Sequence, residues 1–392
     1  MAFAPATVTG NWNYPTPIRF GPGAIEHLAV ACAELGIERP LLVTDRGLAS
    51  LPITEQALTV CQDAKLGVAL YADVHANPAG PDVDGGVEAL HAGDHDGVIA
   101  FGGGSALDVG KAIALMAGQT RPLWDFEDIG DWYTRVDVSA MVPVVAVPTT
   151  SGTGSEVGRC SVIVNTEQQR KVVVFHPNVL PGRVIADPAL TLGLPPGITA
   201  GVGLDALAHN LEAFLAPGFH PMADGIALEG IRLVQTALVR AVNDGSDLEA
   251  RAHMMAASLM GATSFQKGLG AVHALSHPIG VAHRAHHGTT NGVVMPYVLR
   301  FNRPAIEDRV VRLARYLDLP DVSFEGFVNW TLQLREVVGI PHTTAELGMT
   351  EPECAAFAPS AAADPTAATN PIPLTEEILE ALYRKALVGD LS

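Results

Sequence analysis

Cysteine is scarce in this 392-residue sequence, and its few copies are scattered. The four cysteines are Cys32, Cys61, Cys160 and Cys354. None of them forms a CxxC pair or the compact spacing that a disulfide framework or a zinc knuckle would need. This absence argues against a small disulfide-stapled extracellular scaffold and favours a reducing compartment.

Positive charge is also in short supply. The chain has 24 Lys and Arg against 42 Asp and Glu, which gives a formal net charge of −18. Nucleic acids and anionic membrane surfaces carry dense negative charge themselves, so neither is an expected partner of so acidic a chain. The acidic surface is best interpreted as a solubilising one.

Long apolar runs are missing, although 48% of the residues are hydrophobic. No unbroken apolar stretch approaches the roughly 18 residues of a membrane span, so we expect no membrane association. The beginning, MAFAPATVTGNWNY, has no basic residue and no continuous apolar core, so it does not resemble a signal peptide. These features predict a cytoplasmic globular protein that is long enough for two domains.

The first half alternates short apolar, β-rich runs with amphipathic stretches. The predicted strands lie at residues 40–45, 66–74, 96–104 and 142–150, and further β-rich pieces lie at 160–164, 171–175 and 183–188. The predicted helices between them are Gly23 to Leu35, Asp82 to His91 and Ser105 to Met116. This alternation predicts an α/β domain, with a parallel sheet and helices on both of its faces.

Strand signals nearly vanish after Pro188, and long helical patterns follow. Examples are Thr199 to Leu215 and Ser246 to Phe265, where Ser246 and Glu249 have the spacing of a capping box. We therefore predict an α/β domain over residues 1–190 and an all-helical domain over 191–392. An Ala-rich tract at 355–370 is expected to form a short helix and loop.

A run of three glycines in DGVIAFGGGSALDVGKA directly follows a predicted strand and precedes a predicted helix. Glycines let the backbone approach a pyrophosphate closely, and a helix amino terminus offers it free N–H groups. The turn alone is a weak signal, because a tight strand-to-helix connection without a ligand would look the same. It also departs from the GxGxxG pattern, so a standard Rossmann domain is not predicted.

Asp45 closes the predicted strand at 40–45. A carboxylate at that end of a parallel strand can accept hydrogen bonds from a ribose diol and repel a 2′-phosphate, which favours NAD over NADP. The neighbouring Arg46 argues the other way, since a guanidinium can bind that phosphate. A second Gly, Ser and Thr cluster, VPTTSGTGSEVG at 147–158, is ambiguous between a loop and a ligand cradle.

Two groups of residues suggest a metal site in the helical half. Asp205 and His209 stand four apart on a helical pattern, which places both side chains on one face, although a plain Asp–His hydrogen bond has the same spacing. A second group has five histidines within fifteen positions: His273, His277, His283, His286 and His287. Imidazole is the commonest metal ligand in proteins. Spacing alone leaves open which of these histidines would join Asp205.

Together, GGGSALDVGKA, VPTTSGTGSE, LDALAH, GLGAVHALSHPIG and HHG make the chain closely resemble the iron-containing (group III) alcohol dehydrogenase family. The resemblance runs from RFGPGAIEHL near the beginning to TNPIPLT near the end, with order and approximate spacing kept. It implies a dehydroquinate synthase-like architecture in which a dinucleotide-binding α/β domain precedes an all-helical, metal-binding and catalytic domain.

The resemblance also implies site residues. The metal ligands would be Asp205, His209, His273 and His287, with Fe²⁺ the favoured ion and Zn²⁺ an alternative that the donor types also suit. His277 would lie near the metal without binding it and act as a proton relay. The cofactor would be NAD, with NADP left open, held by Asp45, Asn77, Gly103, Gly104, Ser105, Asp108, Thr149, Thr150, Thr153 and Lys171.

The implied activity is hydride transfer between NAD(H) and a small alcohol or aldehyde, with the metal stabilising the alkoxide form of the alcohol. A homodimer or larger homo-oligomer is expected. One departure from the family concerns the substrate pocket: Ala282 and His283 replace a common aromatic pair, and His286 replaces a common proline. Cys160, Phe265 and Leu269 are further candidates for the wall of an altered pocket.

Two alternatives within related architecture stay open. A dehydroquinate synthase-like lyase would need cations for a phosphate-bearing substrate, and only Lys267 and Arg284 lie near the expected ligands in the sequence. A maleylacetate reductase or a hydroxyacid–oxoacid transhydrogenase would need a basic pocket for its anionic substrate, for which Arg159 is a third candidate.

Overall fold

The computed structural model describes residues 14–168 and 170–392 of the chain, and these form two compact units. The α/β unit comprises residues 15–150 and 154–193, and the helical unit contains residues 151–153 and 194–392. The boundary predicted after residue 190 lies shortly before the point where the chain enters the helical unit.

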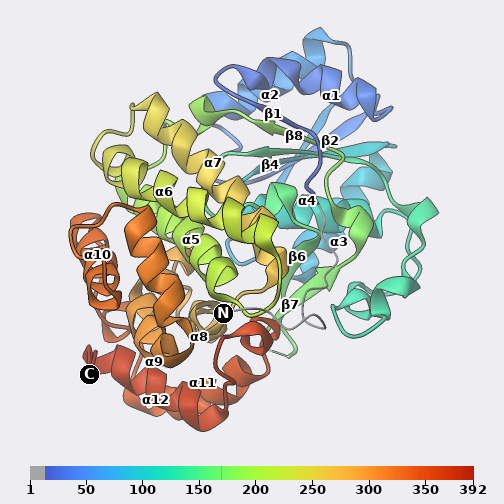
Figure 1. Ribbon diagram of the computed structural model, residues 1–392. Helices are drawn as coiled ribbons and strands as arrows, with labels where there is room; N and C mark the ends of the chain where they lie inside the picture. Colours follow the sequence, from blue (N-terminus) through green and yellow to red (C-terminus); the bar gives the residue numbers. More distant parts are fainter. Residues whose placement is uncertain (1–13, 169) are drawn as a thin grey trace. The chain divides into compact units, whose positions relative to one another are not determined.

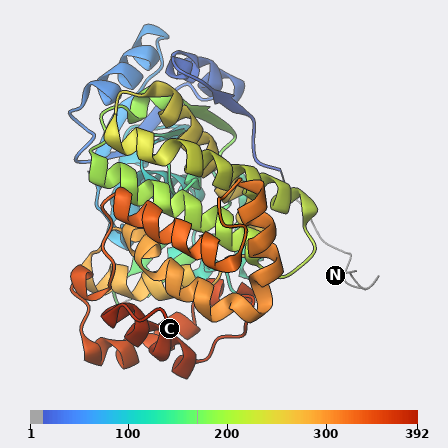
Figure 2. The same ribbon diagram turned by 60° about the vertical axis from the view of Figure 1, so that its left-hand side comes forward.

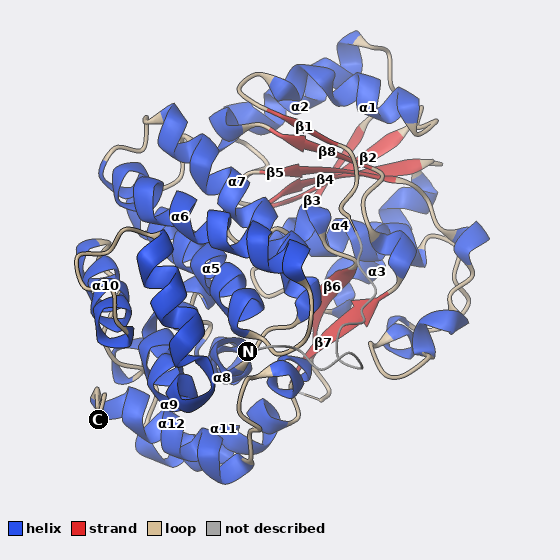
Figure 3. Ribbon diagram, viewed as in Figure 1, coloured by secondary structure: helices blue, strands red, loops and turns tan. Residues whose placement is uncertain are grey.

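The α/β unit is built on one six-stranded sheet with the order β1-β8-β5-β4-β2-β3, in which every neighbouring pair is parallel (Figure 3). Its strands are β1 (Ile18–Phe20), β2 (Pro40–Asp45), β3 (Ala69–Val74), β4 (Gly97–Gly102), β5 (Val144–Pro148) and β8 (Arg183–Ala186). The predicted parallel sheet is confirmed.

Helices cover both faces of this sheet (Figure 1), with α1 (Leu28–Glu34) and α2 (Pro52–Asp63) on one face and α3 (Gly80–Ala92) and α4 (Gly104–Met116) on the other. Successive side chains of a strand point to opposite faces. In β4, Ile99 and Phe101 are fully buried in the core cluster that includes Leu28 of α1. Ala100 points the other way, toward Gly110 of α4, where a Cβ atom would lie 2.6 Å from that of Ala100.

A separate two-stranded antiparallel sheet pairs β6 (Cys160–Asn165) with β7 (Arg170–Phe175). The β-rich pieces expected at 160–164 and 171–175 are therefore strands, but they lie outside the main sheet. The piece at 183–188 contributes β8 to that sheet.

The helical unit has no strand within its described residues from 194 to 392 (Figure 2). Its α-helices are α5 (Pro196–Leu215), α6 (Pro221–Asn243), α7 (Leu248–Ser264), α8 (Ala271–His283), α9 (His287–Tyr316), α10 (Phe324–Val337), α11 (Glu351–Ala362) and α12 (Glu376–Val388). Every residue of α5 from Thr199 to Leu215 is buried, so this helix is the centre of the unit, and α6, α7 and α9 contact it. The predicted all-helical region is confirmed.

One local prediction is wrong. Helix α7 is not capped by the expected pair of Ser246 and Glu249, because the N-cap is Asp247, whose carboxylate accepts the N–H of Ala250 at 2.9 Å. Ser246 instead donates its N–H and hydroxyl to Asp244 in the preceding turn. An aspartate one position later supplies the same kind of cap, so the helix begins one residue further on.

Among the described residues, no helix combines the length and the apolar character needed to cross a membrane.

Candidate metal centre and cofactor site

Three helices of the helical unit bring the predicted metal ligands together. Asp205 and His209 lie one turn apart on α5, His273 lies in the first turn of α8, and His287 is the first residue of α9. Oδ1 of Asp205 is 4.0 Å from Nε2 of His273 and 3.6 Å from Nε2 of His287. One potential ligand atom from each of these three residues lies within 4.8 Å of the other two.

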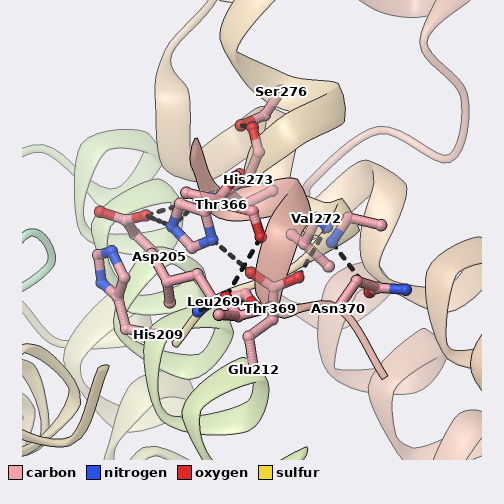
Figure 4. A network of polar contacts seen from close by, with 12 residues as sticks. Asp205, His209, Glu212, Leu269, Val272, His273, Ser276, Thr366, Thr369 and Asn370 are labelled. Carbon is pink, nitrogen blue, oxygen red and sulfur yellow. Dashed lines mark hydrogen bonds and ion pairs between the residues drawn. The ribbon is translucent and has the colours of Figure 1, made fainter. Parts of the chain in front are cut away.

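The fourth predicted ligand, His209, lies against this group without being one of the three. Its ring stacks on that of His273 with 4.7 Å between the ring centroids, and the centroid of the Phe265 ring lies 5.3 Å from that of His209. Asp205, His209 and His273 are all buried, and Figure 4 shows these three side chains close to one another.

Each of the three imidazoles has an oxygen atom beside its Nδ1. Oε2 of Glu212 is 2.6 Å from Nδ1 of His273, and the carbonyl of Gly152 is 3.2 Å from Nδ1 of His209. Oγ of Ser276, whose own hydrogen goes to the carbonyl of His273, is 3.3 Å from Nδ1 of His287. These contacts assign the hydrogen of each neutral ring to Nδ1 and leave Nε2 as a lone pair.

As a result, three hydrogen-bond acceptor atoms, one each from His273, His287 and Asp205, face one another. The Nε2 lone pairs of His273 and His287 face a carboxylate oxygen of Asp205, and none of these atoms can donate a hydrogen bond to another. In the part of the chain that the structure describes, the NH2 group of Asn291 is the one donor that reaches all three atoms, at 2.8 to 3.4 Å, so the arrangement favours a cation among its members. Imidazole nitrogens with one carboxylate and no thiolate suit Fe²⁺, Zn²⁺ and similar divalent ions, so the residues present fit the metal that the sequence predicts.

The charges around the rings agree with this fit. Burial lowers the pKa of His209 to about 4, which keeps its ring neutral and able to bind a metal. Burial also acts to lower the pKa of His273, but the hydrogen bond to Glu212 and the nearby carboxylates outweigh it and raise the pKa overall. The negative charge that favours a proton on His273 would equally favour a metal cation.

Two further residues of the centre were missed by the sequence analysis. Glu212 lies seven residues after Asp205 on α5, and Asn291 lies four residues after His287 on α9. Asn291 donates from Nδ2 to Oδ1 of Asp205 at 2.8 Å, and Glu212 orients His273. Such supporting hydrogen bonds fix the direction of metal ligands. Helical spacing from the predicted ligands could have indicated both residues.

His277 also belongs to this neighbourhood. Its ring stacks on that of His287, with 5.2 Å between centroids and 19° between planes, and its Nδ1 is 2.6 Å from Oδ2 of Asp364. Burial acts to raise the pKa of Asp364, but His277 and Thr366 lower it well below its usual range. No sequence motif indicated Asp364.

The two histidines that depart from the family pattern occupy helix ends. His283, the last residue of α8, has Nε2 3.1 Å from a carboxylate oxygen of Glu353 and its ring beside that of Phe357. His286 is the N-cap of α9 and accepts the N–H of Thr289 at 3.4 Å. Both side chains therefore have contacts that stabilise local structure.

In the α/β unit, the predicted cofactor residues gather at the carboxyl ends of adjacent strands. Strands β2 and β4 are neighbours in the sheet. The chain goes from β2 to β3 on one side of this pair and from β4 to β5 on the other side, so the direction in which strands are added reverses between β2 and β4. Ligands of open α/β sheets bind outside the strand ends at such a reversal. Asp45 ends β2, and Gly103 and Gly104 follow β4 as the N-cap and first residue of α4.

No side chain among the described residues caps α4, so its first N–H groups point out of the helix end without a side-chain partner. This is the arrangement that binds a phosphate. Ser105 lies in the same first turn. Thr149 and Thr150 follow β5, and the Cγ2 of Thr150 lies 3.3 Å from where a Cβ of Gly103 would be, so a glycine makes room there.

The other predicted cofactor residues are more dispersed. Asn77 lies between β3 and α3 with a left-handed backbone, at a φ of 52°. Lys171 lies in β7, and Thr153 belongs to the helical unit.

Asp108 is engaged inside the α/β unit. It accepts hydrogen bonds from the hydroxyl of Ser155 and the N–H of Val162, and it pairs with the buried Lys111 at 3.3 Å. Burial raises the pKa of the neighbouring Glu156 to about 7. These contacts anchor the loop after β5, and the sequence analysis did not anticipate Lys111 or Glu156.

Comparison with known proteins agrees with this geometry. Residues 15–188 match the family model described as iron-containing alcohol dehydrogenase, and residues 199–387 match the C-terminal model of the Fe-containing alcohol dehydrogenase family. The chain is 41% identical over 383 residues to the 4-hydroxybutyrate dehydrogenase of Cupriavidus necator, covering 95% of this chain and 98% of that relative.

Two other proteins are similar to this chain over almost its whole length. The NAD-dependent methanol dehydrogenase of Bacillus methanolicus is 32% identical over 387 residues, which cover 96% of this chain and 100% of that protein. The crystal structure of a 1,3-propanediol oxidoreductase superposes with a TM-score of 0.91 at 33% identity, over 96% of this chain and 100% of the other. The chain belongs to the iron-containing alcohol dehydrogenase family and is a metal-dependent alcohol oxidoreductase.

Proposed function

We propose that this chain transfers a hydride between NAD(H) and a small alcohol or aldehyde, and that it holds one divalent metal through Asp205, His209, His273 and His287. The observation that carries the proposal is the set of three imidazoles whose Nδ1 atoms each face an oxygen, so that the Nε2 lone pairs of two of them converge on Asp205. Family membership supports an alcohol as the substrate.

A divalent ion bound there would supply Lewis acidity toward the substrate oxygen. The protein supplies the rest. Glu212 and Asn291 hold His273 and Asp205 in place, and the burial of these groups keeps water from competing for the ligand atoms. His277 would take up the alcohol proton at Nε2 while its Nδ1 stays hydrogen-bonded to Asp364.

The cofactor would bind at the reversal of the sheet order in the α/β unit. The first turn of α4, from Gly103 to Ser105, would hold the pyrophosphate, and Asp45 would accept hydrogen bonds from the adenosine ribose. Asp108 would support this site by anchoring the loop after β5. Asn77 would lie at the adenine side, and Thr149, Thr150, Thr153 and Lys171 would hold the nicotinamide ribose.

We propose NAD rather than NADP because of how Asp45 and Arg46 are held. Oδ1 of Asp45 accepts the N–H groups of Gly47 and Leu48, which fixes the carboxylate at the strand end. Arg46 is paired with Asp73 at 2.9 Å and is thereby drawn away from a 2′-phosphate. Among the relatives, one is named as NAD-dependent.

Asp45→Asn should raise kcat/KM with NADP by about tenfold, because it removes a negative charge next to the 2′-phosphate, while its amide oxygen can still accept the two backbone N–H groups. Initial rates with NAD and NADP would measure the change. Arg46→Ala is the matched control and should not improve NADP use. If Asp45→Asn leaves the ratio of kcat/KM with NADP to kcat/KM with NAD unchanged, the adenosine ribose does not bind next to Asp45.

Iron is the proposed metal because of the family to which the chain belongs, with Zn²⁺ as the alternative that the same ligands accept. We also propose a cytoplasmic location and a homodimer or larger homo-oligomer. A panel of alcohols and aldehydes with NAD and NADP, followed at the nicotinamide absorbance, tests the proposed reaction.

A second candidate substrate is an ω-hydroxy acid, favoured by the 4-hydroxybutyrate dehydrogenase among the relatives. Such a substrate needs a cation near the metal. The side chain of Lys267 is only 2% exposed and is paired with Asp224 at 2.6 Å, and Arg159, in the other unit, lies over the ring of Phe175. Arg284 lies three residues before His287 and forms no ion pair or hydrogen bond with residues 14–168 and 170–392.

If the substrate is such an acid, Arg284→Ala should raise the KM for 4-hydroxybutyrate about tenfold or more and leave the KM for 1-butanol nearly unchanged, because only the acid has a carboxylate to lose a cationic partner. Arg312→Ala, on α9, is the control. Equal effects on both substrates would argue against recognition of a carboxylate by Arg284.

A further inference from the structure

The Ala-rich tract that stands out in the sequence, residues 355–370, ends beside the metal centre. It begins within α11 and continues into a 3-10 helix, η11 (Pro365–Thr369). We call residues 364–370 the clamp segment. Figure 4 shows Thr366, Thr369 and Asn370 of this segment next to His273 and Leu269.

The end of the clamp segment holds the beginning of α8. Thr369 Oγ1 accepts the N–H of Leu269 at 3.0 Å and donates to its carbonyl at 2.9 Å. Helix α8 starts after Gly270 and has no cap of its own, so Oδ1 of Asn370 accepts the N–H of Ala271 at 3.1 Å instead. Glu212 accepts the next N–H, from Val272, at 2.7 Å.

This contact explains the glycines of the GLG sequence before α8. A Cβ atom on Gly268 would lie 2.5 Å from Cβ of Thr369, and a Cβ atom on Gly270 would lie 2.8 Å from Oδ1 of Asn370. Only glycine allows the clamp segment to approach this closely. The close approach fixes the helix turn that carries His273.

The other end of the clamp segment reaches His277, one turn further along α8. The two oxygens of Asp364 have separate partners. Oδ1 accepts the N–H of Thr366 at 2.9 Å and its hydroxyl at 2.6 Å, which shapes the turn locally. Oδ2 lies 2.6 Å from Nδ1 of His277, and both side chains are largely buried, at 12% and 16% exposure.

We propose that Asp364 is a positioning residue of the active site: its Oδ2 fixes the tautomer and the orientation of the His277 ring. The inference rests on the proposed function for the role of His277. A neutral imidazole can carry its hydrogen on either nitrogen, and a carboxylate beside Nδ1 selects the form that has the hydrogen there and the lone pair on Nε2. That form is the one that can accept a proton from an alcohol.

Because the two oxygens of Asp364 have different partners, the substitution Asp364→Asn can change the contact with His277 and keep the contacts with Thr366. The amide oxygen can keep the hydrogen bonds to Thr366, while the NH2 group can only donate to Nδ1 of His277. The variant should therefore keep the turn and reverse the tautomer. The control is Asp247→Asn, since Asp247 also caps a backbone N–H with Oδ1 and has a second side-chain partner, Arg240, which contacts both of its oxygens.

The experiment compares both variants with the wild type, each loaded with Zn²⁺, in steady-state kinetics, metal analysis and NMR of ¹⁵N-labelled histidines near pH 8. The His277 signal is the one absent from His277→Ala. For Asp364→Asn we expect kcat to fall about 10- to 100-fold, with KM and metal content unchanged. The His277 signal should move from the Nδ1–H form to the Nε2–H form, and Asp247→Asn should change neither.

The proposal is overturned if folded Asp364→Asn keeps the kcat and the His277 signal of the wild type. It is equally overturned if kcat falls only together with loss of metal, because Asp364 would then act on the fold of the site and not on His277. A wild type that oxidises no alcohol would contradict the proposed function. The NMR comparison would still decide the role of Asp364 in that case.

Discussion

Replacing His273 with alanine is expected to lower kcat/KM roughly 10³-fold and to abolish stoichiometric metal binding. His273 is buried, its Nε2 faces Asp205 at 4.0 Å, and its Nδ1 is held by Glu212 at 2.6 Å. A metal ion held by these residues would stabilise the transition state by several kcal/mol, which corresponds to a rate effect of about this size.

The measurement combines metal analysis with steady-state rates on the purified variant. His253→Ala is a suitable control because this histidine lies on α7 of the same unit, outside the cluster. It should keep both the metal and the rate. A His273→Ala protein with a full complement of metal and near-normal rate would remove His273 from the ligand set.

Glu212→Gln should weaken metal binding about 10- to 100-fold, the usual cost of removing a residue that orients a metal ligand. One oxygen of Glu212 accepts the N–H of Val272, and an amide oxygen can still do so. The NH2 group cannot accept the Nδ1 hydrogen of His273, so the ring loses the contact that turns its Nε2 lone pair toward Asp205.

Competition against a chelator of known affinity measures this loss directly, apart from any effect on the rate. Glu229→Gln provides the matched control, since Glu229 pairs with Arg232 on the surface of α6 and has no part in the metal centre. Equal metal affinity in Glu212→Gln and the wild type would show that the orientation of His273 does not depend on Glu212.

Part of the metal centre could be predicted from local spacing alone. Asp205 and His209 stand four apart on a pattern that is apolar on every side, and α5 is indeed the buried centre of its unit. Spacing could not select among the histidines of 273–287, because the choice depends on how α8 and α9 meet α5, which no local pattern specifies. The resemblance to a known family supplied that choice.

Some of the residues that support the predicted ligands could also be predicted from local spacing, and others could not. Glu212 and Asn291 continue the helix faces of predicted ligands, so the same spacing rule could have indicated them. Asp364 could not have been found, since 87 residues separate it from His277 and its Ala-rich surroundings carry no sign of a site. The hydrogen positions on the three imidazoles likewise follow only from which oxygens the folded chain places beside them.

Much of the fold could be predicted because local sequence patterns specify strands and helices. Strand β2 coincides with the expected run at 40–45, because a strand buried on both faces shows consecutive apolar residues, here Leu41, Leu42 and Val43. The beginning of α7 was misplaced by one residue, because Ser246 and Asp247 are both good N-cap residues and the sequence does not show which of them the chain uses.

The most direct test of the metal centre is removal and return of the metal in the wild-type protein. The chain is stripped with a chelator, assayed with NAD and a primary alcohol, and titrated anaerobically with Fe²⁺ and in parallel with Zn²⁺. We predict that activity disappears with the metal and returns in step with one bound ion per chain, and that Asp205→Ala binds none. Full activity in the metal-free protein would contradict the account.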